Sequence, residues 1–251
     1  MTPTEDREGV CVVLGVGPSR GLGAALCRAF ARAGATVVAA GRTRERLEAV
    51  AADILQGGGR AEAVVCDATD EDAVRALFDR AAELGPLGAA IYNVGNNRPG
   101  AIAEMETAYF ERAWRIGCLG GFLFGREAVR RWQGETEPAA RRSLLFTGAS
   151  ASLRGRAGFG AFAAAKGALR QLAQSLAREH GPDGIHVAHV VVDGGIAGDK
   201  IEQGAPEFAQ RVGPDGLIDL DGLANAYRFL HGQEPSAWTF ELDLRTAQEG
   251  W

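Results

Sequence analysis

A lysine and a phenylalanine stand one helical turn apart in the stretch GFGAFAAAKGALRQLAQSLAREHG, residues 158–181. Lys166 follows Phe162 by four residues, and residues four apart lie on the same face of a helix. An ammonium group can donate hydrogen bonds to hydroxyls, carbonyls and anions, whereas a phenyl ring has no proton to exchange. The pair is therefore suited to holding a ligand rather than to moving protons, unless Lys166 is simply a surface lysine.

A second stretch whose residue types are suited to binding a ligand is GVGPSRGLG, residues 15–23. Gly17, Gly21 and Gly23 have the spacing G-x-x-x-G-x-G between an apolar run and a predicted helix. Glycine lets the backbone turn tightly and approach a phosphate, which the amino end of the helix then attracts. Because glycine turns are common in α/β proteins, the position directly after the first apolar run is what favours a nucleotide site. The other residues expected to bind there are Ser19, Arg20 and Leu22.

Residues after the next two apolar runs predict which nucleotide binds. Arg42 stands where an acidic residue would favour NAD by accepting from the ribose hydroxyls. An arginine there, with Arg20, favours the 2′-phosphate of NADP, although Arg42 could instead decorate an exposed helix start. Asp67, followed by Ala68, could accept from an adenine amino group or cap the next helix. We therefore expect NADP(H) in preference to NAD(H).

Apolar runs and amphipathic segments alternate along the chain. Runs such as VCVVLGV at 10–16 have the unbroken apolar character of strands that are buried on both faces. The segments between them carry apolar residues at helical spacing, and several end at glycine. Strands are expected at 10–16, 36–40, 61–67, 88–94, 142–148, 184–195 and 238–245, and helices at 23–34, 43–55, 70–84, 108–132, 158–180 and 223–232.

This alternation predicts an α/β fold: a single-domain, Rossmann-type, doubly wound parallel sheet of about seven strands with helices on both faces. No linker divides the chain, so residues 10–251 are expected to form one domain after a flexible tail at 1–9. Ligands of such sheets bind beyond the carboxyl ends of the strands, where the residues singled out above all lie. Close packing against another backbone is expected at four glycines of one predicted helix, Gly117, Gly120, Gly121 and Gly125.

The composition of the 251-residue chain excludes several function classes. The net charge is −5 and no basic cluster stands out, so neither nucleic acid nor an anionic membrane is an expected partner. The four cysteines lie far apart, which predicts buried apolar side chains and no metal site. No secretory signal is present and no apolar run approaches about 18 residues, so a cytoplasmic location is expected.

Taken together, the motifs make the chain similar to the short-chain dehydrogenase/reductase family over essentially its whole length. The family's glycine turn matches Gly17–Gly23, and its Asn-Ala-Gly element matches NVG from Asn93 to Gly95. Its Pro-Gly element after the sixth strand aligns with Asp193 and Gly194. The resemblance implies a dinucleotide cofactor and further cofactor-binding positions at Asn93, Gly95, Lys166, Asp193, Gly194 and Ile196.

The resemblance is incomplete at the family's four catalytic positions, which are tyrosine, lysine, serine and asparagine. By spacing, the tyrosine is Phe162, the serine is Ala149 and the asparagine is Gly117, so only the lysine is kept, as Lys166. In this respect the sequence resembles an atypical branch of the family with phenylalanine in place of the tyrosine. Loss of a positioned general acid lowers a rate by about 10²–10⁴-fold. Lys166 is then expected to hold the ribose hydroxyls beside the nicotinamide.

Several side chains could take over from the missing acid. Ser150 lies one residue beyond the lost serine. Asp193 could touch the carboxamide, act as an acid if desolvated, or only shape a turn. Arg154 could bind an acidic substrate or lie in a solvated loop. Structural, buried roles are expected for Tyr92, His186 and His189.

Three functions remain open from the sequence. The first is an NADP(H)-linked oxidoreductase acting on ketones and alcohols, with water, Ser150 or a substrate group supplying the proton. The second is a nucleotide-binding protein without redox turnover, and the third is a non-redox isomerase, lyase or hydrolase that reuses the same site. We favour the first, acting on an unknown small molecule, because the cofactor-binding elements are nearly complete. The resemblance also implies a homodimer or homotetramer, built through the helices at 109–132 and 158–180.

Overall fold

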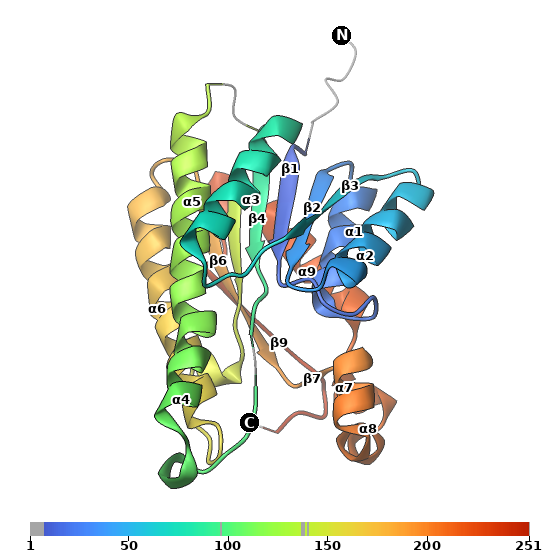
Figure 1. Ribbon diagram of the computed structural model, residues 1–251, viewed down its shortest axis with the longest axis vertical. Helices are drawn as coiled ribbons and strands as arrows, with labels where there is room; N and C mark the ends of the chain where they lie inside the picture. The colour runs from blue at the N-terminus through green and yellow to red at the C-terminus, as the bar shows by residue number, and fades with distance from the viewer. Residues whose placement is uncertain (1–7, 96, 137–138, 140, 251) are drawn as a thin grey trace.

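The computed structural model describes residues 8–95, 97–136, 139 and 141–250 (Figure 1). In this described part, seven parallel strands form one sheet in the order β3-β2-β1-β4-β5-β6-β9. The strands are β1 (Val10–Leu14), β2 (Thr36–Gly41), β3 (Arg60–Val65), β4 (Leu87–Tyr92), β5 (Ser143–Thr147), β6 (His186–Asp193) and β9 (Glu241–Arg245). The strand order reverses beside β1, so the predicted doubly wound parallel sheet is confirmed.

The helices are α1 (Leu22–Arg32), α2 (Arg44–Gln56), α3 (Glu71–Leu84), α4 (Thr107–Trp114), α5 (Gly120–Gly134), α6 (Gly160–His180), α7 (Asp199–Gly204), α8 (Pro206–Val212) and α9 (Leu220–His231). Helices α1, α2 and α9 pack with Cys11 and Val13 of β1 on one face of the sheet, and α3, α5 and α6 pack with Val12 and Leu14 on the other (Figure 1). This alternation follows from the two-residue period of a strand. None of the helices in the described residues is long and apolar enough to cross a bilayer.

The helix predicted at 108–132 is interrupted. A π-helical turn at Arg115–Leu119 joins α4 to α5. Tyr92 in β4 is fully buried, as predicted, and its hydroxyl donates to the Ile116 carbonyl at 2.5 Å, which satisfies a carbonyl in the widened turn. The sequence pattern did not reveal the interruption because one extra residue in a single turn hardly changes the apolar spacing.

The glycines of this helix pair lie where a side chain would collide with a neighbour. A Cβ atom at Gly117 would lie 2.6 Å from the Cβ atom of Ala165 in α6. Gly120 lies against the Tyr92 hydroxyl, and Gly121 lies against Leu169. The predicted close packing is therefore confirmed, but the nearest atom at each of the four glycines belongs to a side chain and not to another backbone.

The segment from 194 to 216 carries elements that the sequence did not predict. It contains α7, α8 and a strand β7 (Gly195–Ile196), which pairs in parallel with β8 (Leu217–Ile218). Figure 1 shows α7 and α8 beyond the lower end of the main sheet. A 3₁₀ turn at Pro214–Gly216 ends this segment, and other single 3₁₀ turns lie at Ile102–Glu104, Ser150–Ser152 and Pro235–Ala237.

The predicted tail at 1–9 lies outside the described residues except for its last two. Glu8 accepts two hydrogen bonds from the Arg228 guanidinium, at 2.8 and 2.9 Å, and lies 3.1 Å from His231 Nε2. Burial raises the pKa of Glu8, but the hydrogen bonds from His231 and Arg228 outweigh it and lower the pKa to about 2. The carbonyl of Gly9 accepts from the Thr36 amide at 3.0 Å. Glu8 and Gly9 are thus held by the fold, because α9 supplies partners that a local reading of the sequence does not show.

Candidate functional site

The glycine turn links β1 to α1 and lies against the end of β2. Gly15 has a φ of 108°, and the amides of Gly15 and Val16 both donate to the Ala40 carbonyl at 2.9 Å. A Cβ atom at Gly23 would lie 2.6 Å from the Gly15 carbonyl oxygen, so glycine lets α1 begin this close to the turn. In the described part of the chain, no atom outside Gly17 and its two chain neighbours lies within 4 Å of where its Cβ would be. Protein packing does not require a glycine there, and the open space leaves the backbone accessible to a ligand.

The amino end of α1 is open to an anion. Its N-cap, Gly21, offers no side-chain acceptor, and the first turn contains no acidic residue. The free N–H groups and the positive end of the helix dipole therefore favour a phosphate. Leu22 is buried and anchors the turn, and Arg28 donates to the carbonyl and hydroxyl oxygens of Ser19 at 2.8 and 2.6 Å. These features fit the pyrophosphate of a dinucleotide.

The positions expected to meet the adenosine lie at the ends of β2 and β3. The Asp67 carboxylate accepts from the amide and hydroxyl of Thr69, both at 2.8 Å. The Thr69 amide is the main cause of a lowered pKa for Asp67, and the charge of exposed Arg42 contributes. Asp70 rather than Asp67 caps α3, through the amides of its next turn. Ala68 is 5% exposed, so it offers a ligand little beyond its backbone.

Asn93 and Gly95 lie between the glycine turn and Lys166. The Asn93 amide donates to the Gly15 carbonyl at 3.1 Å, so its side chain braces the turn. A Cβ atom at Gly95 would lie 3.3 Å from Lys166 Nζ, so glycine leaves room for the ammonium group. Asn93, through its side chain, and Gly95, through its lack of one, therefore shape the site by contacts within the protein.

Lys166 is buried, with 4% of its surface exposed, and the surface-lysine alternative is wrong. Its Nζ donates to the carbonyl of Thr147, the last residue of β5, at 2.7 Å and to that of Val94, two residues after β4, at 3.1 Å. An ammonium has three N–H donors, so one direction remains for a ligand. Burial lowers the pKa of Lys166 to about 8, and the charge of Lys200 in α7 adds to this effect. Lys166 is thus fixed at the predicted edge of the sheet and remains charged at neutral pH.

The other three catalytic positions of the resemblance hold no proton donor. Phe162 is half-buried in the first turn of α6, one turn before Lys166. The Ala149 amide donates to the hydroxyl of Ser152 at 3.2 Å. Gly117 is so close to α6 that the side chain of an asparagine would have no room. The missing asparagine therefore reflects how closely two helices pack.

Ser150 begins the 3₁₀ turn that follows β5. It is half-buried, and its hydroxyl makes no hydrogen bond to any residue that the structure describes. Ser152, two residues further on, is instead buried, and its hydroxyl accepts from the Ala149 amide. Of these two serines, Ser150 has the hydroxyl that is available to a ligand.

Asp193 ends β6 as a buried ion-pair residue. Its carboxylate accepts from Arg154 Nη2 at 3.2 Å and lies 3.6 Å from Arg245 Nη1. No local pattern showed this pairing, and the expected roles of Asp193 in contacting a carboxamide, as an acid or in shaping a turn stay predictions. Gly194 follows with a φ of 150°, and Ile196 lies in β7 at the base of the 194–216 segment.

Arg20 differs most from its expected role. Glu202 of α7 accepts from both Nη atoms of Arg20, at 2.8 and 2.6 Å, and the Asp199 amide donates to the Arg20 carbonyl at 2.9 Å. The guanidinium therefore links α7 to the glycine turn, and both of its Nη atoms are bound to Glu202 and not to a 2′-phosphate. Its partner lies 182 residues further along the chain, so nothing local could have shown the pair. Of the two arginines expected to bind a 2′-phosphate, Arg42 has no such carboxylate partner among the described residues.

Four residues at the site were missed from the sequence: Arg28, Val94, Thr147 and Glu202. Val94 and Thr147 act through carbonyl oxygens, which every residue type has, so no sequence signal marked them. Arg28 did carry a signal, because a basic residue two turns into the helix after a glycine turn can reach back to that turn.

The two histidines of β6 have structural roles, as predicted. His186 is buried, stacks on Trp238 and donates from Nε2 to the Thr239 carbonyl at 2.9 Å. His189 is fully buried, and its Nδ1 lies 3.0 Å from Glu241. Burial lowers the pKa of His189 to about 4, so it is neutral at physiological pH. Among the described residues, no group of three or more His, Cys, Asp or Glu side chains could hold a metal ion.

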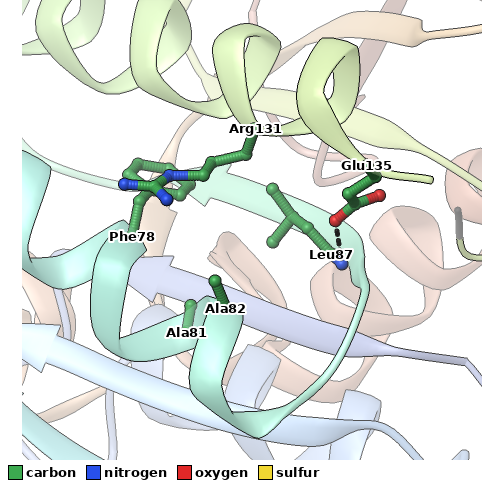
Figure 2. Close-up of a pocket in the computed structure, with 6 residues that line it drawn as sticks. All are labelled: Phe78, Ala81, Ala82, Leu87, Arg131 and Glu135. Carbon is green, nitrogen blue, oxygen red and sulfur yellow. Dashed lines mark hydrogen bonds between the residues drawn. The ribbon is translucent and has the colours of Figure 1, made fainter. Parts of the chain in front are cut away.

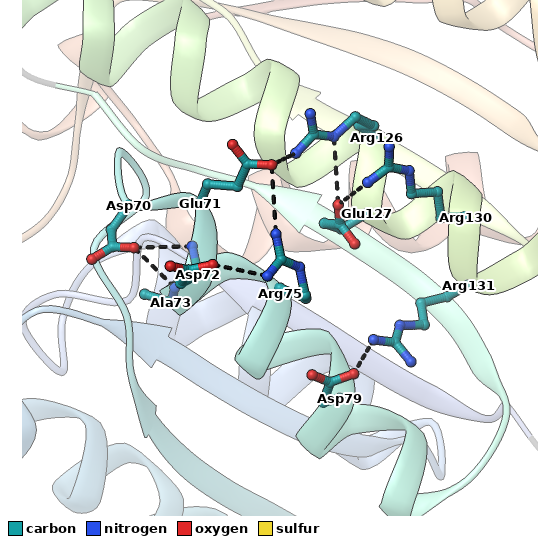
Figure 3. Close-up of polar contacts among 10 residues, drawn as sticks. All are labelled: Asp70, Glu71, Asp72, Ala73, Arg75, Asp79, Arg126, Glu127, Arg130 and Arg131. Atoms are coloured by element: carbon teal, nitrogen blue, oxygen red, sulfur yellow. Dashed lines mark hydrogen bonds and ion pairs between the residues drawn. The ribbon is translucent and has the colours of Figure 1, made fainter.

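Two hollows lie away from this site, between α3 and α5. Figure 2 shows a cavity of about 10 Å³ at the amino end of β4, lined by Phe78, Ala81, Ala82, Leu87, Arg131 and Glu135. An adjoining hollow of about 440 Å³ contains Arg75, Arg130 and Arg131. Figure 3 shows that all three arginines are already paired with acidic side chains. We therefore place the functional site at the opposite edge of the sheet, where the strands end.

Comparison with known proteins gives the same assignment. A family model described as short chain dehydrogenase matches residues 11–201. The cis-4-hydroxycyclohexanecarboxylate dehydrogenase of Sinomonas cyclohexanicum is 36% identical over 182 residues, which cover 72% of this chain and 70% of that protein. A solved short-chain dehydrogenase from Rhodopseudomonas palustris has a TM-score of 0.80 and 38% identity, covering 95% of this chain and 99% of that one.

A solved metagenomic short-chain oxidoreductase in complex with NADP has a TM-score of 0.77 and 25% identity, covering 97% of this chain and all of that one. That protein was solved with a dinucleotide, the class of ligand that the glycine turn and the open end of α1 favour in this chain. From the strand order, the glycine turn, the buried Lys166 and the extent of these matches, it follows that the chain belongs to the short-chain dehydrogenase/reductase family of oxidoreductases.

Proposed function

We propose that the protein transfers a hydride between NADP(H) and a ketone or alcohol, with Lys166 as the one retained member of the family's four catalytic side chains. The observation that carries the proposal is the buried ammonium of Lys166, fixed between the ends of β4 and β5. Burying a charged group costs free energy unless hydrogen bonds or an ionic partner compensate for the lost water. The open turn at Gly17 and the uncapped end of α1 offer the pyrophosphate a place beside it.

The chain's own residues contribute binding and orientation. When bound, the cofactor supplies or accepts the hydride. The amino end of α1 attracts its negative charge, and the unused N–H direction of Lys166 is available to a ribose hydroxyl. We assign the proton on the substrate oxygen to the Ser150 hydroxyl, which is free to rotate, or to water. Since Phe162 donates no proton, turnover is expected to be about 10²–10⁴-fold slower than with a tyrosine at that position.

The preference for NADP over NAD is proposed from Arg42. It is exposed after β2 and forms no ion pair with the residues that the structure describes, so its guanidinium can take a phosphate. The NADP complex of the metagenomic relative supports this choice. Arg20 does not contribute, because Glu202 occupies it.

A homodimer or homotetramer is proposed from the surface of α4 and α5. Phe110, Trp114 and Phe122 are each at least 40% exposed and follow one another at four- and eight-residue spacing. Exposed aromatic side chains in a row favour burial against a second copy of the chain. Light scattering during size-exclusion chromatography tests this proposal, and a monomer at micromolar concentration would contradict it.

Calorimetric titration with NADPH and NADH is the direct test of the cofactor site. NADPH should bind more tightly than NADH, and Arg42→Ala should weaken NADPH binding by about 10- to 100-fold while leaving NADH unchanged. Arg46→Ala, an exposed arginine two residues into α2, is the matched control. Equal affinities for the two cofactors would remove the NADP preference.

Turnover is tested with NADP⁺ and cis-4-hydroxycyclohexanecarboxylate, the hydroxy acid in the name of the Sinomonas relative, as a first alcohol. Phe162→Tyr should raise the rate toward that of a complete enzyme, by up to about 10²–10⁴-fold, because Lys166 is already in place. Binding of NADPH without turnover in either form would favour the second function, a nucleotide-binding protein. Absence of NADPH binding would favour a non-redox enzyme.

A further inference from the structure

Arg154 reaches from the loop after β5 to the end of β6. Its amide donates to the Ser150 carbonyl at 3.1 Å, which folds the loop back on its own 3₁₀ turn. Its side chain then crosses to Asp193, where Nη2 donates to the carboxylate at 3.2 Å. Arg154 therefore bridges the loop that holds Ser150 to the strand from which the 194–216 segment departs.

The two partners differ sharply in exposure. The Asp193 side chain is 4% exposed, whereas the Arg154 side chain is 49% exposed. Asp193 also lies 3.6 Å from Arg245, which in turn pairs with Asp243. Charges thus alternate along a chain of four side chains that begins at Asp243 and ends at Arg154. The buried carboxylate fixes one edge of the Arg154 guanidinium and leaves other N–H donors of the fork facing solvent.

The order of the strands places Arg154 on the substrate side of the site. The glycine turn follows β1, Lys166 bridges the ends of β4 and β5, and Arg154 lies at the end of β6. Adjacent strands are about 4.8 Å apart, so the end of β6 lies about 10 Å beyond that of β4, on the side away from the glycine turn. A dinucleotide that runs from the glycine turn to Lys166 would not reach Arg154. Arg154 is therefore available to contact the substrate that reacts with the dinucleotide.

Three acidic side chains of β6 and α7 are paired with arginines, whereas Glu249 lies beside Gly194, where its Oε2 would be 3.7 Å from a Cβ. Asp193 is paired with Arg154, and Glu202 and Asp199 of α7 face Arg20 at 2.6 and 3.9 Å. Lys166 and Lys200 add positive charge from α6 and α7; burial is the main cause of the lowered pKa of Lys166, and the charge of Lys200 contributes. An anionic group that enters beside Arg154 therefore meets cations and an exposed planar fork.

We propose that Arg154 binds a carboxylate of the substrate, and that Asp193 is a positioning residue that orients its guanidinium. The planar fork of an arginine matches a carboxylate in two parallel hydrogen bonds. The inference rests on the proposed function for the place of the reacting carbon, near Ser150 and Lys166. It adds the substrate class: a ketone or alcohol that carries a carboxylate.

The test compares keto acids with their own methyl esters. The probes are 4-oxocyclohexanecarboxylate and 4-oxopentanoate, each beside its ester, titrated calorimetrically into the NADPH-loaded protein and into the protein alone. In the wild type, at least one acid should bind about 10- to 100-fold more tightly than its ester. Arg154→Gln should abolish the difference by weakening only the acid. Arg156→Gln is the matched control in the same loop, where the guanidinium lies over the Phe159 ring, and it should keep the difference.

Asp193→Asn separates positioning from support of the fold. It should weaken acid binding several-fold and leave ester binding unchanged; equal weakening of both would overturn the positioning role. The carboxylate site itself is overturned if neither acid binds more tightly than its ester, or if the preference survives Arg154→Gln. A protein that binds the acids without NADPH binding or turnover would refute the proposed function alone, so the two failures are distinguishable.

Discussion

Replacing Gly117 by alanine tests whether helix packing excludes a side chain at the family's asparagine position. The new Cβ would lie 2.6 Å from the Cβ of Ala165, where ordinary contacts are 3.4–4 Å. Ala165 is 3% exposed and directly precedes Lys166, so α6 cannot yield without moving the ammonium group. Both the stability and the cofactor site should therefore respond to a single methyl group.

The magnitude follows from two opposing effects. Overpacking a filled interior costs about 1–3 kcal/mol. Alanine in place of glycine recovers about 1 kcal/mol of helix propensity. The free energy of unfolding should fall by about 1 kcal/mol, and NADPH should bind more weakly as the bond from Lys166 to the Thr147 carbonyl, now 2.7 Å, lengthens.

Urea unfolding and NADPH titration measure the two effects. Gly167→Ala is the control in the same region, since the nearest atom to its new Cβ would be the Ser152 carbonyl oxygen at 4.0 Å. It should be more stable than the wild type by about 0.5–1 kcal/mol. Combining Gly117→Ala with Ala165→Gly should cost less than the sum of the two single changes. A Gly117→Ala protein as stable as the wild type, or a double variant without this coupling, would refute the reasoning.

Three further outcomes are expected. NADPH binding should weaken as the pH rises through about 8, where Lys166 loses its charge, and calorimetry above and below that pH should show no such trend for Lys166→Met. Glu202→Gln should release the hold on Arg20 and speed NADPH dissociation by about 1.5- to 5-fold in stopped flow, with high salt giving the wild type the same rate. Glu8 has a pKa of about 2 when folded and 4.5 as the reference value, so it stabilises the fold above pH 4.5 and this contribution is lost as the pH falls toward 2. Glu8→Gln should then be less stable in urea at neutral pH but equal to the wild type in acid.

The fold could be predicted because its signals are local. Strands such as β1, β4, β5 and β6 are buried along their whole length, so their sequences are mostly apolar, without the alternation of a half-exposed strand. The glycine turn could also be predicted, because the spacing of Gly17, Gly21 and Gly23 is a property of one short loop. Lys166 was found from its place in a family pattern, and its burial then gave that place a physical meaning.

The parts that escaped prediction depend on partners distant in sequence. The pairs of Arg20 with Glu202 and of Arg154 with Asp193 join residues that no local period relates. An arginine in a loop reads the same whether it faces a ligand, a carboxylate of its own chain or water. The 194–216 segment could not be predicted for another reason. Helices α7 and α8 are short and none of their residues is buried, so the sequence shows no apolar periodicity there.

The π-helical turn at Arg115–Leu119 sets how α4 is rotated about its axis relative to α5. Each residue of an α-helix turns the chain by about 100°, so removing one residue from this turn would rotate α4 by that angle relative to α5. Ala113, which α4 buries, would swing out of its contact, and the exposed rings of Phe110 and Trp114 would point in a new direction. The surface that this helix presents is thus fixed by the length of a single turn, whose Ile116 carbonyl is held by one tyrosine hydroxyl in the neighbouring sheet.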